Sequence, residues 1–161
     1  MPKFLKEILP FIIIVAAIII VRLFVITPVT VSGASMEKTL NDKEVMLLYK
    51  FNRNNIKRYD IVVLTLGKER LIKRVIALPN EKIRCTNGII YINDEEKSNE
   101  YGYGNNMDFE EITLKSNEYF VMGDNRENSL DSRYFGPVDK EQILGNTNFV
   151  IFPFTKWGKV K

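Results

Sequence analysis

Residues 60–78 read DIVVLTLGKERLIKRVIAL and predict two β-strands, at about 60–66 and 70–78. Both are rich in the β-branched and aliphatic residues that favour extended structure. Lys73 and Arg74 interrupt the second strand. Because side chains alternate along a strand, these two cations should lie on opposite faces. We therefore expect one of them to be exposed and the other to be desolvated among apolar neighbours.

Similar runs on both sides extend the β pattern along the chain. Five more strands are expected, at about 44–49, 82–85, 88–92, 118–123 and 146–152. Asn87 and Gly88 are the dipeptide typical of a hairpin turn, and Val29 and Val31 fall on one face of a further half-buried segment. Residues 93–117 are polar and indicate an insertion with little core. The sequence thus predicts a mainly β, antiparallel domain.

Composition excludes several classes of function. The 161 residues are 45% apolar and 27% charged, as expected for about one folded domain. The chain has no histidine, which excludes a Ser-His-Asp triad, and its single cysteine, Cys85, cannot form an internal disulfide or a cysteine-rich zinc site. We expect no metal and no cofactor. A net charge of +3 is too small to indicate nucleic-acid binding.

Residues 8–26 read ILPFIIIVAAIIIVRLFVI and predict one transmembrane helix. At about 1.5 Å per residue, such a helix nearly matches the ~30 Å hydrocarbon core. Pro10 lies in its first turn and Arg22 near its end, where neither opposes insertion. Basic residues within 1–7 favour a cytoplasmic N-terminus, which makes 27–161 an extracellular domain held at the cell membrane by a single pass.

Two other interpretations of residues 8–26 remain open. A buried helix of a soluble protein would normally have a polar face for solvent, which this segment lacks. A cleaved signal peptide is the second alternative, because Ser32 and Ala34 are small and spaced like a cleavage site, although Arg22 does not suit it. We carry the membrane anchor forward.

Three segments hold reactive side chains in unusual surroundings. The first, SGASMEKTL at 32–40, has small residues before Ser35 that let the backbone turn and approach another segment closely. The second is the strand of Lys73, where burial would lower the lysine pKa, whereas Arg74 cannot lose its proton. The third, VMGDNRENSLDSRYFGPV at 121–138, mixes Asp and Arg residues that can hold a loop through ion pairs.

Each segment also has a purely structural interpretation. Ser35 can serve a turn, and Lys73 and Arg74 can be exposed cations that protect a sheet edge. The third segment has the acids and amides of a calcium loop, but Arg126 occupies the second ligand position and the central glycine is missing.

Taken together, the segments resemble the bacterial type I signal peptidases, membrane-anchored serine proteases that remove signal peptides from exported proteins. The match runs in order through the anchor, SGASMEKTL, YDIVVL at 59–64, LIKRVIALPNE at 71–81 and MGDNRENSLDSRYFGPV. The short length and single anchor are similar to Gram-positive members. The resemblance implies a β-rich catalytic domain with 86–117 as a variable β insertion. It also implies signal peptides of secreted preproteins and the lipid bilayer as partners, and we expect a monomer.

The resemblance further implies roles for individual residues. Ser35 would be the nucleophile and Lys73 the general base of a Ser/Lys dyad that cleaves after small residues. Ser129 would orient the lysine ammonium, while Asp131 and Arg133 would form a supporting ion pair. Shallow substrate pockets would be lined by Val29, Val31, Met36, Leu71 and Ile72.

Two positions depart from the family pattern. Lys38 replaces a proline, and restoring proline should be tolerated and stabilise by about 0.4–1 kcal/mol if the local φ is near −65°. Gly33 stands where some members have a serine that donates to the oxyanion, so the Ser35 backbone N–H would carry that role.

Three other functions compete with signal-peptide removal. A self-cleaving Ser/Lys repressor would need a DNA-binding helix-turn-helix in place of residues 8–26. A catalytically dispensable peptidase homologue, acting as an extracellular assembly module, would be favoured by loss of Ser35 or Lys73, and both are present. An anchored adhesion module explains the architecture but not the segment 121–138.

Overall fold

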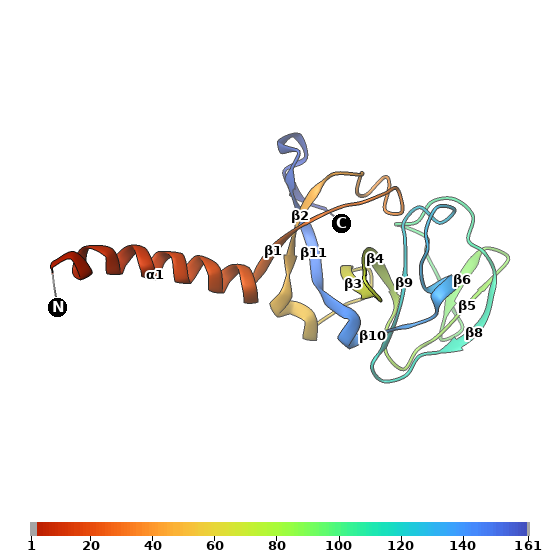
Figure 1. The fold of residues 1–161 in the computed structure, drawn as a ribbon. Helices are drawn as coiled ribbons and strands as arrows, with labels where there is room; N and C mark the ends of the chain where they lie inside the picture. The colour runs from red at the N-terminus through yellow and green to blue at the C-terminus, as the bar shows by residue number, and fades with distance from the viewer. Residues whose placement is uncertain (1–2, 161) are drawn as a thin grey trace.

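A helix followed by two β-sheets makes up residues 3–160, the part of the chain that this computed structural model describes. Helix α1 (Lys3–Phe24) projects from the β-rich body (Figure 1). It ends at Phe24 because strand β1 (Ile26–Thr30) already pairs with β2 (Val45–Tyr49). Helix α1 thus begins before the segment 8–26 and ends two residues short of its end, and Pro10 lies inside the helix rather than in its first turn.

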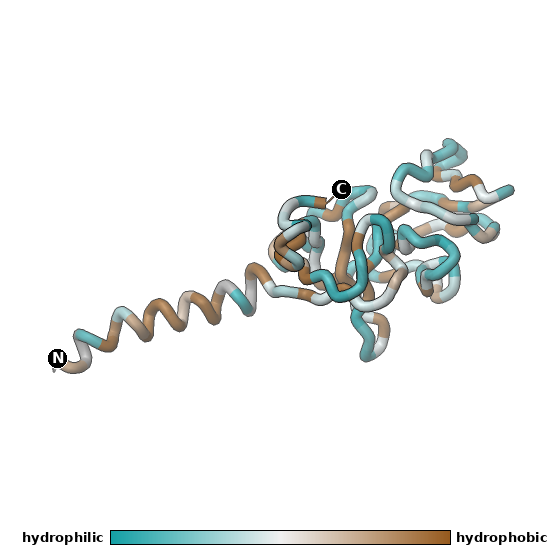
Figure 2. The backbone as a smooth tube through the Cα atoms, turned by 90° about the horizontal axis from the view of Figure 1, so that it is seen from above, coloured by the Kyte–Doolittle hydropathy of each residue, from teal (hydrophilic) through white to brown (hydrophobic). Residues whose placement is uncertain are grey.

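The hydrophobic character of α1 is continuous along much of its length (Figure 2). Most of its described apolar side chains are exposed, including Phe11, Ile13 and Ile18 at 69%, 58% and 61%. Within residues 3–160, no described helix is both long enough and apolar enough to cross a membrane. The transmembrane helix expected from the sequence is thus not confirmed.

The larger sheet carries the candidate site. Its eight strands run in the order β1-β2-β11-β3-β4-β9-β10, with β12 pairing to β11, and all their pairings are antiparallel. Strand β4 pairs with β3 from Glu69 to Arg74 and with β9 from Arg74 onward. The remaining strands are β3 (Ile61–Leu66), β4 (Glu69–Ala77), β9 (Glu118–Met122), β10 (Val138–Asp139), β11 (Ile143–Phe152) and β12 (Gly158–Lys159).

A smaller sheet of four strands runs in the order β7-β6-β5-β8. Asn87 and Gly88 have φ values of 53° and 75°, which confirms the hairpin turn between β5 and β6. Phe109 and Ile112 of β8 pack against a cluster of buried apolar residues that includes Ile83 and Phe120. The region 93–117, which was expected to have little core, therefore contributes to the core. The strands are β5 (Lys82–Thr86), β6 (Ile89–Ile92), β7 (Glu95–Lys97) and β8 (Phe109–Thr113).

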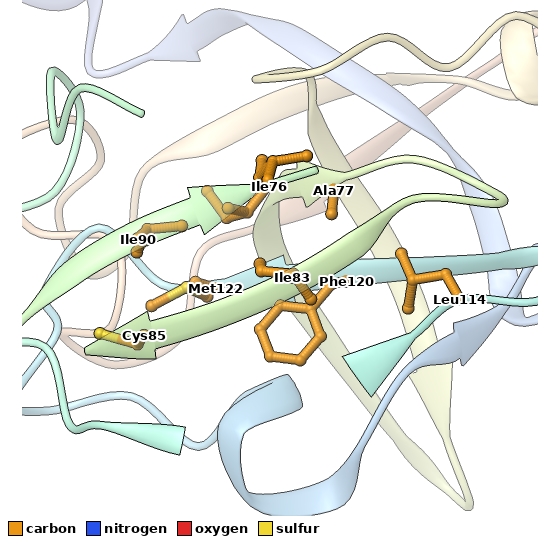
Figure 3. Packing of buried hydrophobic residues seen from close by; sticks show 9 residues of the cluster. Ile76, Ala77, Ile83, Cys85, Ile90, Leu114, Phe120 and Met122 are labelled. Atoms are coloured by element: carbon orange, nitrogen blue, oxygen red, sulfur yellow. The ribbon is translucent and has the colours of Figure 1, made fainter. Parts of the chain in front are cut away.

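Apolar clusters hold the sheets and the site segments in place. Figure 3 shows Ile83, Phe120 and Met122 packing together where the smaller sheet meets β4 and β9. A second cluster, which includes Val31 and Met36, fixes the segment after β1. Short helices complete the chain: α2 (Ser132–Phe135), η1 (Lys50–Asn54), η2 (Lys140–Gln142) and η3 (Phe154–Lys156).

Candidate active site

A compact turn after β1 presents Ser35. The chain reverses at Gly33, whose φ of +84° suits glycine and whose N–H donates to Asp42 Oδ1 at 2.8 Å. Met36 and Leu40 are 1% and 0% exposed and are joined by a 2.7 Å backbone hydrogen bond. Ser35 therefore lies on a segment whose position is fixed by buried apolar side chains.

Lys73 reaches Ser35 from strand β4. Lys73 Nζ donates to Ser35 Oγ at 2.7 Å, and the lysine is only 3% exposed. Burial lowers the pKa of Lys73 from 10.5 to about 8, with Arg133 acting in the same direction and Asp131 opposing it. Residues 38 positions apart in the sequence are thus joined in one partly buried contact.

Arg74 is buried as well, which corrects the expectation that one of the two adjacent cations would be exposed. Its side chain is 1% exposed and donates to Asp124 Oδ1 and Oδ2 at 2.8 and 2.6 Å. It also donates to the Tyr59 carbonyl at 2.9 Å and lies over the Tyr101 ring. A buried cation is tolerated here because a carboxylate and a carbonyl replace its hydration.

The expected ion pair between Asp131 and Arg133 is present next to the dyad. Arg133 Nε and Nη2 each donate to the Asp131 carboxylate at 2.8 Å, and Gly123 N–H donates to it at 2.9 Å. Burial would raise the pKa of Asp131, but these donors outweigh it and hold the pKa below its usual value. Asp131 therefore supplies a fixed negative charge near Lys73.

Ser129 does not make the expected hydrogen bond to Lys73. Its Oγ is buried near Asp131, yet among the described residues no well-formed hydrogen bond reaches it. A Cβ atom on Gly123 would collide with Ser129 Oγ and with the Ser35 carbonyl oxygen. Glycine at 123 thus lets the loop approach the Ser35 turn closely.

A cleft of about 270 Å³ opens beside Ser35 and Lys73. Of the residues expected to form substrate pockets, four line it: Val31, Met36, Leu71 and Ile72. Val29 does not line the cleft; its side chain packs against the cluster that includes Val31 and Met36. Other walls come from Arg70, Asn128 and Leu130.

Comparisons with known proteins agree with this geometry. A family model described as "Signal peptidase, peptidase S26" matches residues 4–152. The chain belongs to the signal peptidase family. It is therefore an enzyme, a signal peptidase of the S26 peptidases, and the resemblance seen in the sequence is confirmed.

Individual signal peptidases match most of the chain. Signal peptidase I of Bacillus amyloliquefaciens is 39% identical over 165 residues, covering 93% of this chain and 89% of the relative. Signal peptidase IB of Staphylococcus aureus strain COL is 33% identical over 178 residues, covering 94% and 93%. A crystal structure of a signal peptidase I from Enterococcus faecalis V583 matches with a TM-score of 0.52 and 31% identity, covering 58% of this chain and 97% of that one. The β-rich signal peptidase fold is thereby confirmed.

Lys38 corrects one expectation about this peptidase. Its φ is +72°, whereas proline is restricted to about −65°. The idea that proline would be tolerated and stabilising at this position is therefore wrong for this turn. The Lys38 ammonium lies 4.1 Å from the centre of the Tyr103 ring, a cation–π contact that accompanies the unusual backbone.

Sequence reasoning missed two residues that join the signal peptidase segments. Asn125 donates from its backbone to the Ser35 carbonyl at 3.0 Å and from its side chain to the Ala34 carbonyl at 3.2 Å. Asp124 accepts from Thr39 Oγ1 at 2.6 Å in addition to binding Arg74. These partners lie 50 to 91 residues away, so no local pattern could have identified them.

Among the described residues, no group of three or more Cys, Asp or Glu side chains is arranged to hold a metal ion. Asp131 and Asp124 are each occupied by an arginine partner.

Proposed function

We propose that the protein is a membrane-anchored serine endopeptidase that removes signal peptides from exported preproteins, with Ser35 as nucleophile and Lys73 as general base. The observation that carries the proposal is the 2.7 Å contact between Lys73 Nζ and Ser35 Oγ beside an open cleft. With a pKa of about 8, roughly one lysine in ten is neutral at pH 7. A base of this strength suits a peptidase without histidine.

Acylation begins with the neutral Lys73 amine. The Ser35 hydroxyl donates its proton to Nζ while Oγ forms a bond to the substrate carbonyl carbon, which gives a tetrahedral oxyanion and a lysine ammonium. The oxyanion collapses, the peptide C–N bond breaks, and the ammonium gives its proton to the leaving amine. The products are an acyl-Ser35 ester, a free amine and a neutral lysine.

Deacylation repeats these steps with water. Neutral Lys73 takes a proton from water as its oxygen attacks the ester, and the ammonium then returns a proton to Ser35 Oγ. Asp131 lies close enough to raise the pKa of Lys73 and so to stabilise the ammonium formed in each half-reaction. We assign Asp131, Arg133 and Ser129 as positioning residues for the lysine.

Oxyanion stabilisation falls to the Ser35 backbone N–H in this proposal. No backbone hydrogen bond of the described residues uses that N–H as donor. Gly33 offers no hydroxyl, and its left-handed backbone disfavours a serine there. A donor fixed by the buried neighbours Met36 and Leu40 needs little reorganisation when charge develops.

Substrate would bind as an added strand. Strand β1 lies at an edge of the larger sheet, and residues 69–73 of β4 have β3 as their only strand partner among the described residues. The cleft lies between these two unpaired edges. Main-chain hydrogen bonds from both would hold an extended peptide independently of its sequence.

Selectivity for small residues follows from what lines the cleft beside Ser35. Met36 and Val31 are almost fully buried there, so they cannot easily move away to admit a large side chain. A precursor with alanine one and three residues before the scissile bond should be cut, and phenylalanine just before that bond should block cleavage.

Helix α1 would supply the anchor. Many of its described apolar side chains are exposed, and a bilayer is the solvent that suits them. The helix itself projects from the β body (Figure 2). We propose a cytoplasmic segment 1–7, an anchor within 8–26 and an extracellular catalytic domain 27–161 in which 86–117 is a variable insertion. We further propose that the enzyme acts as a monomer at the cell membrane.

The decisive experiment is cleavage of a model preprotein by the wild-type enzyme and by Ser35→Ala in detergent micelles. We expect Ser35→Ala to be folded but inactive, because removing one hydroxyl from a turn costs little stability. Ser32→Ala is the matched control, since Ser32 is exposed three residues away. Cleavage by Ser35→Ala at the wild-type rate would refute the nucleophile.

A further inference from the structure

A second cavity, of about 360 Å³, opens at the end of the larger sheet that is nearest to α1. Thr27 is one of its lining residues and lies three positions after the end of α1, where its hydroxyl donates to the Arg22 carbonyl at 2.9 Å. The complete lining is Thr27, Leu48, Lys50, Arg53, Arg70 and Leu144. The cavity therefore lies where the helix joins the β body.

The lining of this cavity is strongly cationic. Lys50 and Arg53 come from η1 and Arg70 from the exposed start of β4, and none of the six lining residues is acidic. Among the described residues, Arg53 and Arg70 form no ion pair. Their positive charge is thus available to an anion from outside the protein.

The chemistry of the lining selects a phosphate. Guanidinium groups donate paired N–H groups in the geometry that phosphate oxygens accept, and an ammonium adds a point charge. Leu48 and Leu144 supply apolar wall beside these donors. Such a combination of cations and aliphatic surface matches a phosphodiester with attached carbon better than a bare inorganic ion.

We propose that this cavity binds the phosphate of an anionic lipid headgroup. The inference rests on the membrane anchoring by α1 proposed above, which would hold the cavity at the bilayer surface. Phe51, also in η1, is 65% exposed next to the cationic residues, as expected of a side chain that enters the apolar part of the interface. Basic residues at the bilayer surface are attracted to anionic lipids.

Arg53 is the side chain to change in a test. Arg70 also lines the cleft beside the dyad, so its replacement would disturb substrate binding. Lys82 provides the control because it is an exposed cation on β5 of the other sheet, with 52% of its side chain accessible and only an exposed ion pair, to Glu111 at 3.1 Å, among the described residues. Both are converted to glutamate, and Arg53→Gln is included as the milder change.

The experiment follows the melting temperature of the full-length protein in uncharged detergent micelles. Dihexanoyl phosphatidylglycerol, dihexanoyl phosphatidylcholine and inorganic phosphate are titrated separately. We expect the phosphatidylglycerol to raise the melting temperature of the wild type, with phosphatidylcholine nearly inert. The midpoint of that titration should rise about tenfold or more in Arg53→Glu, less in Arg53→Gln, and not at all in Lys82→Glu.

The outcomes separate the possible sources of the phosphate. An equal response to inorganic phosphate, lost in Arg53→Glu, would keep the phosphate site but overturn the lipid as its source. No response of the wild type to phosphatidylglycerol, or an unchanged response in both Arg53 variants, would overturn the site itself. The readout requires no proteolysis and no bilayer, so it can fail while the proposed peptidase activity stands.

Discussion

The two sheets bury different kinds of side chain. The smaller sheet closes on an aliphatic and aromatic cluster around Ile83 and Phe120, in which no member is charged. The larger sheet and its loop bury Lys73, Arg74 and Asp131 at 3%, 1% and 0% exposure. A fold of this size needs only the first kind of core, so the costly burial of charge indicates where chemistry is carried out.

The buried cations Lys73, Arg74 and Arg133 also differ from one another. Arg74 is paired with Asp124 and Arg133 with Asp131, each through two short hydrogen bonds. Lys73, by contrast, hydrogen-bonds to a neutral hydroxyl, and within residues 3–160 it has no ion pair. Two of these cations are thus held in buried ion pairs, whereas burial lowers the pKa of the third to about 8.

The largest expected effect comes from Lys73→Arg. Arginine keeps the positive charge but cannot act as a base, so activity should fall by about 10³-fold or more, as in Lys73→Ala. Preprotein cleavage measures the loss, and circular dichroism checks that both variants are folded. Near-normal cleavage by Lys73→Arg would make Lys73 a structural cation like Arg74.

Next in size is the effect of Asp124→Asn on stability. The variant leaves the Arg74 guanidinium buried without its counter-charge, which should lower the free energy of unfolding by about 3–5 kcal/mol. Urea denaturation gives the value. Asp94→Asn, which breaks the exposed pair with Arg84, should cost under about 1 kcal/mol. Similar losses in the two variants would show that burial of the ion pair is unimportant.

Ile83→Ala tests the smaller sheet by itself. Ile83 is fully buried, and its truncation should destabilise by about 2–5 kcal/mol through lost contacts and a cavity. Below its melting temperature the variant should keep kcat/KM within about twofold of the wild type, because no charged group moves. A large fall in kcat/KM of the folded variant would mean that the two sheets are not functionally separate.

The pH dependence of wild-type cleavage should report the Lys73 pKa. Below about pH 8 the rate should fall about tenfold per pH unit as the amine is protonated, and above it the rate should level off. Stability responds in a different window. The pKa of Lys73 is lower in the folded protein than in the unfolded chain, so protonation of this lysine favours the unfolded chain. The free energy of unfolding should therefore fall as the pH falls from about 10.5 to about 8, with no further loss from Lys73 below that.

Lys73→Met is the control for the pH experiment. Its stability should lack the slope between about pH 8 and 10.5, since methionine carries no proton to lose. For the wild type, a profile of cleavage rate against pH with its midpoint near pH 10 would show that Lys73 is not desolvated in solution.

Lys38 gives the smallest of the expected effects. Lys38→Pro should destabilise by more than about 1 kcal/mol because proline cannot adopt a φ of +72°, whereas Lys38→Asn, which tolerates that region, should change stability by less than about 0.5 kcal/mol. Thermal denaturation compares the two. A stabilised proline variant would show that the turn adopts the usual family conformation instead.

The sequence predicted most strands because their signals are local. Strand β3 was expected at 60–66 and spans Ile61–Leu66, and β4 was expected at 70–78 and spans Glu69–Ala77. Strand β8 was missed because Phe109–Thr113 contains two consecutive glutamates, which hide its two inward-facing apolar residues. Period-two patterns are reliable only where the polar and apolar faces are both clear.

The site was predicted less completely than the strands. Ser35 and Lys73 were singled out by the resemblance to the signal peptidases, since their local patterns alone also fit a turn and a sheet edge, and the structure joins them. Burial of Arg74 could not be foreseen, because its partner Asp124 lies 50 residues along the chain and the alternation rule says nothing about such contacts. The same limit applies to Asn125, whose backbone N–H, in the segment 121–138, donates to the Ser35 carbonyl.

The short connection between α1 and β1 limits how far Ser35 can lie from the end of the helix. Only Val25 separates the helix from the strand, and Lys50 N–H holds the Val25 carbonyl at 3.0 Å. Eleven residues lead from Phe24 to Ser35, so Ser35 can lie at most about 40 Å beyond the end of α1. If α1 is the proposed anchor, this short connection keeps Ser35 near the bilayer. Peptide bonds are then selected by their distance from the bilayer as well as by the residues beside them. A suitable small residue in a distant loop of a secreted protein therefore lies beyond the reach of Ser35.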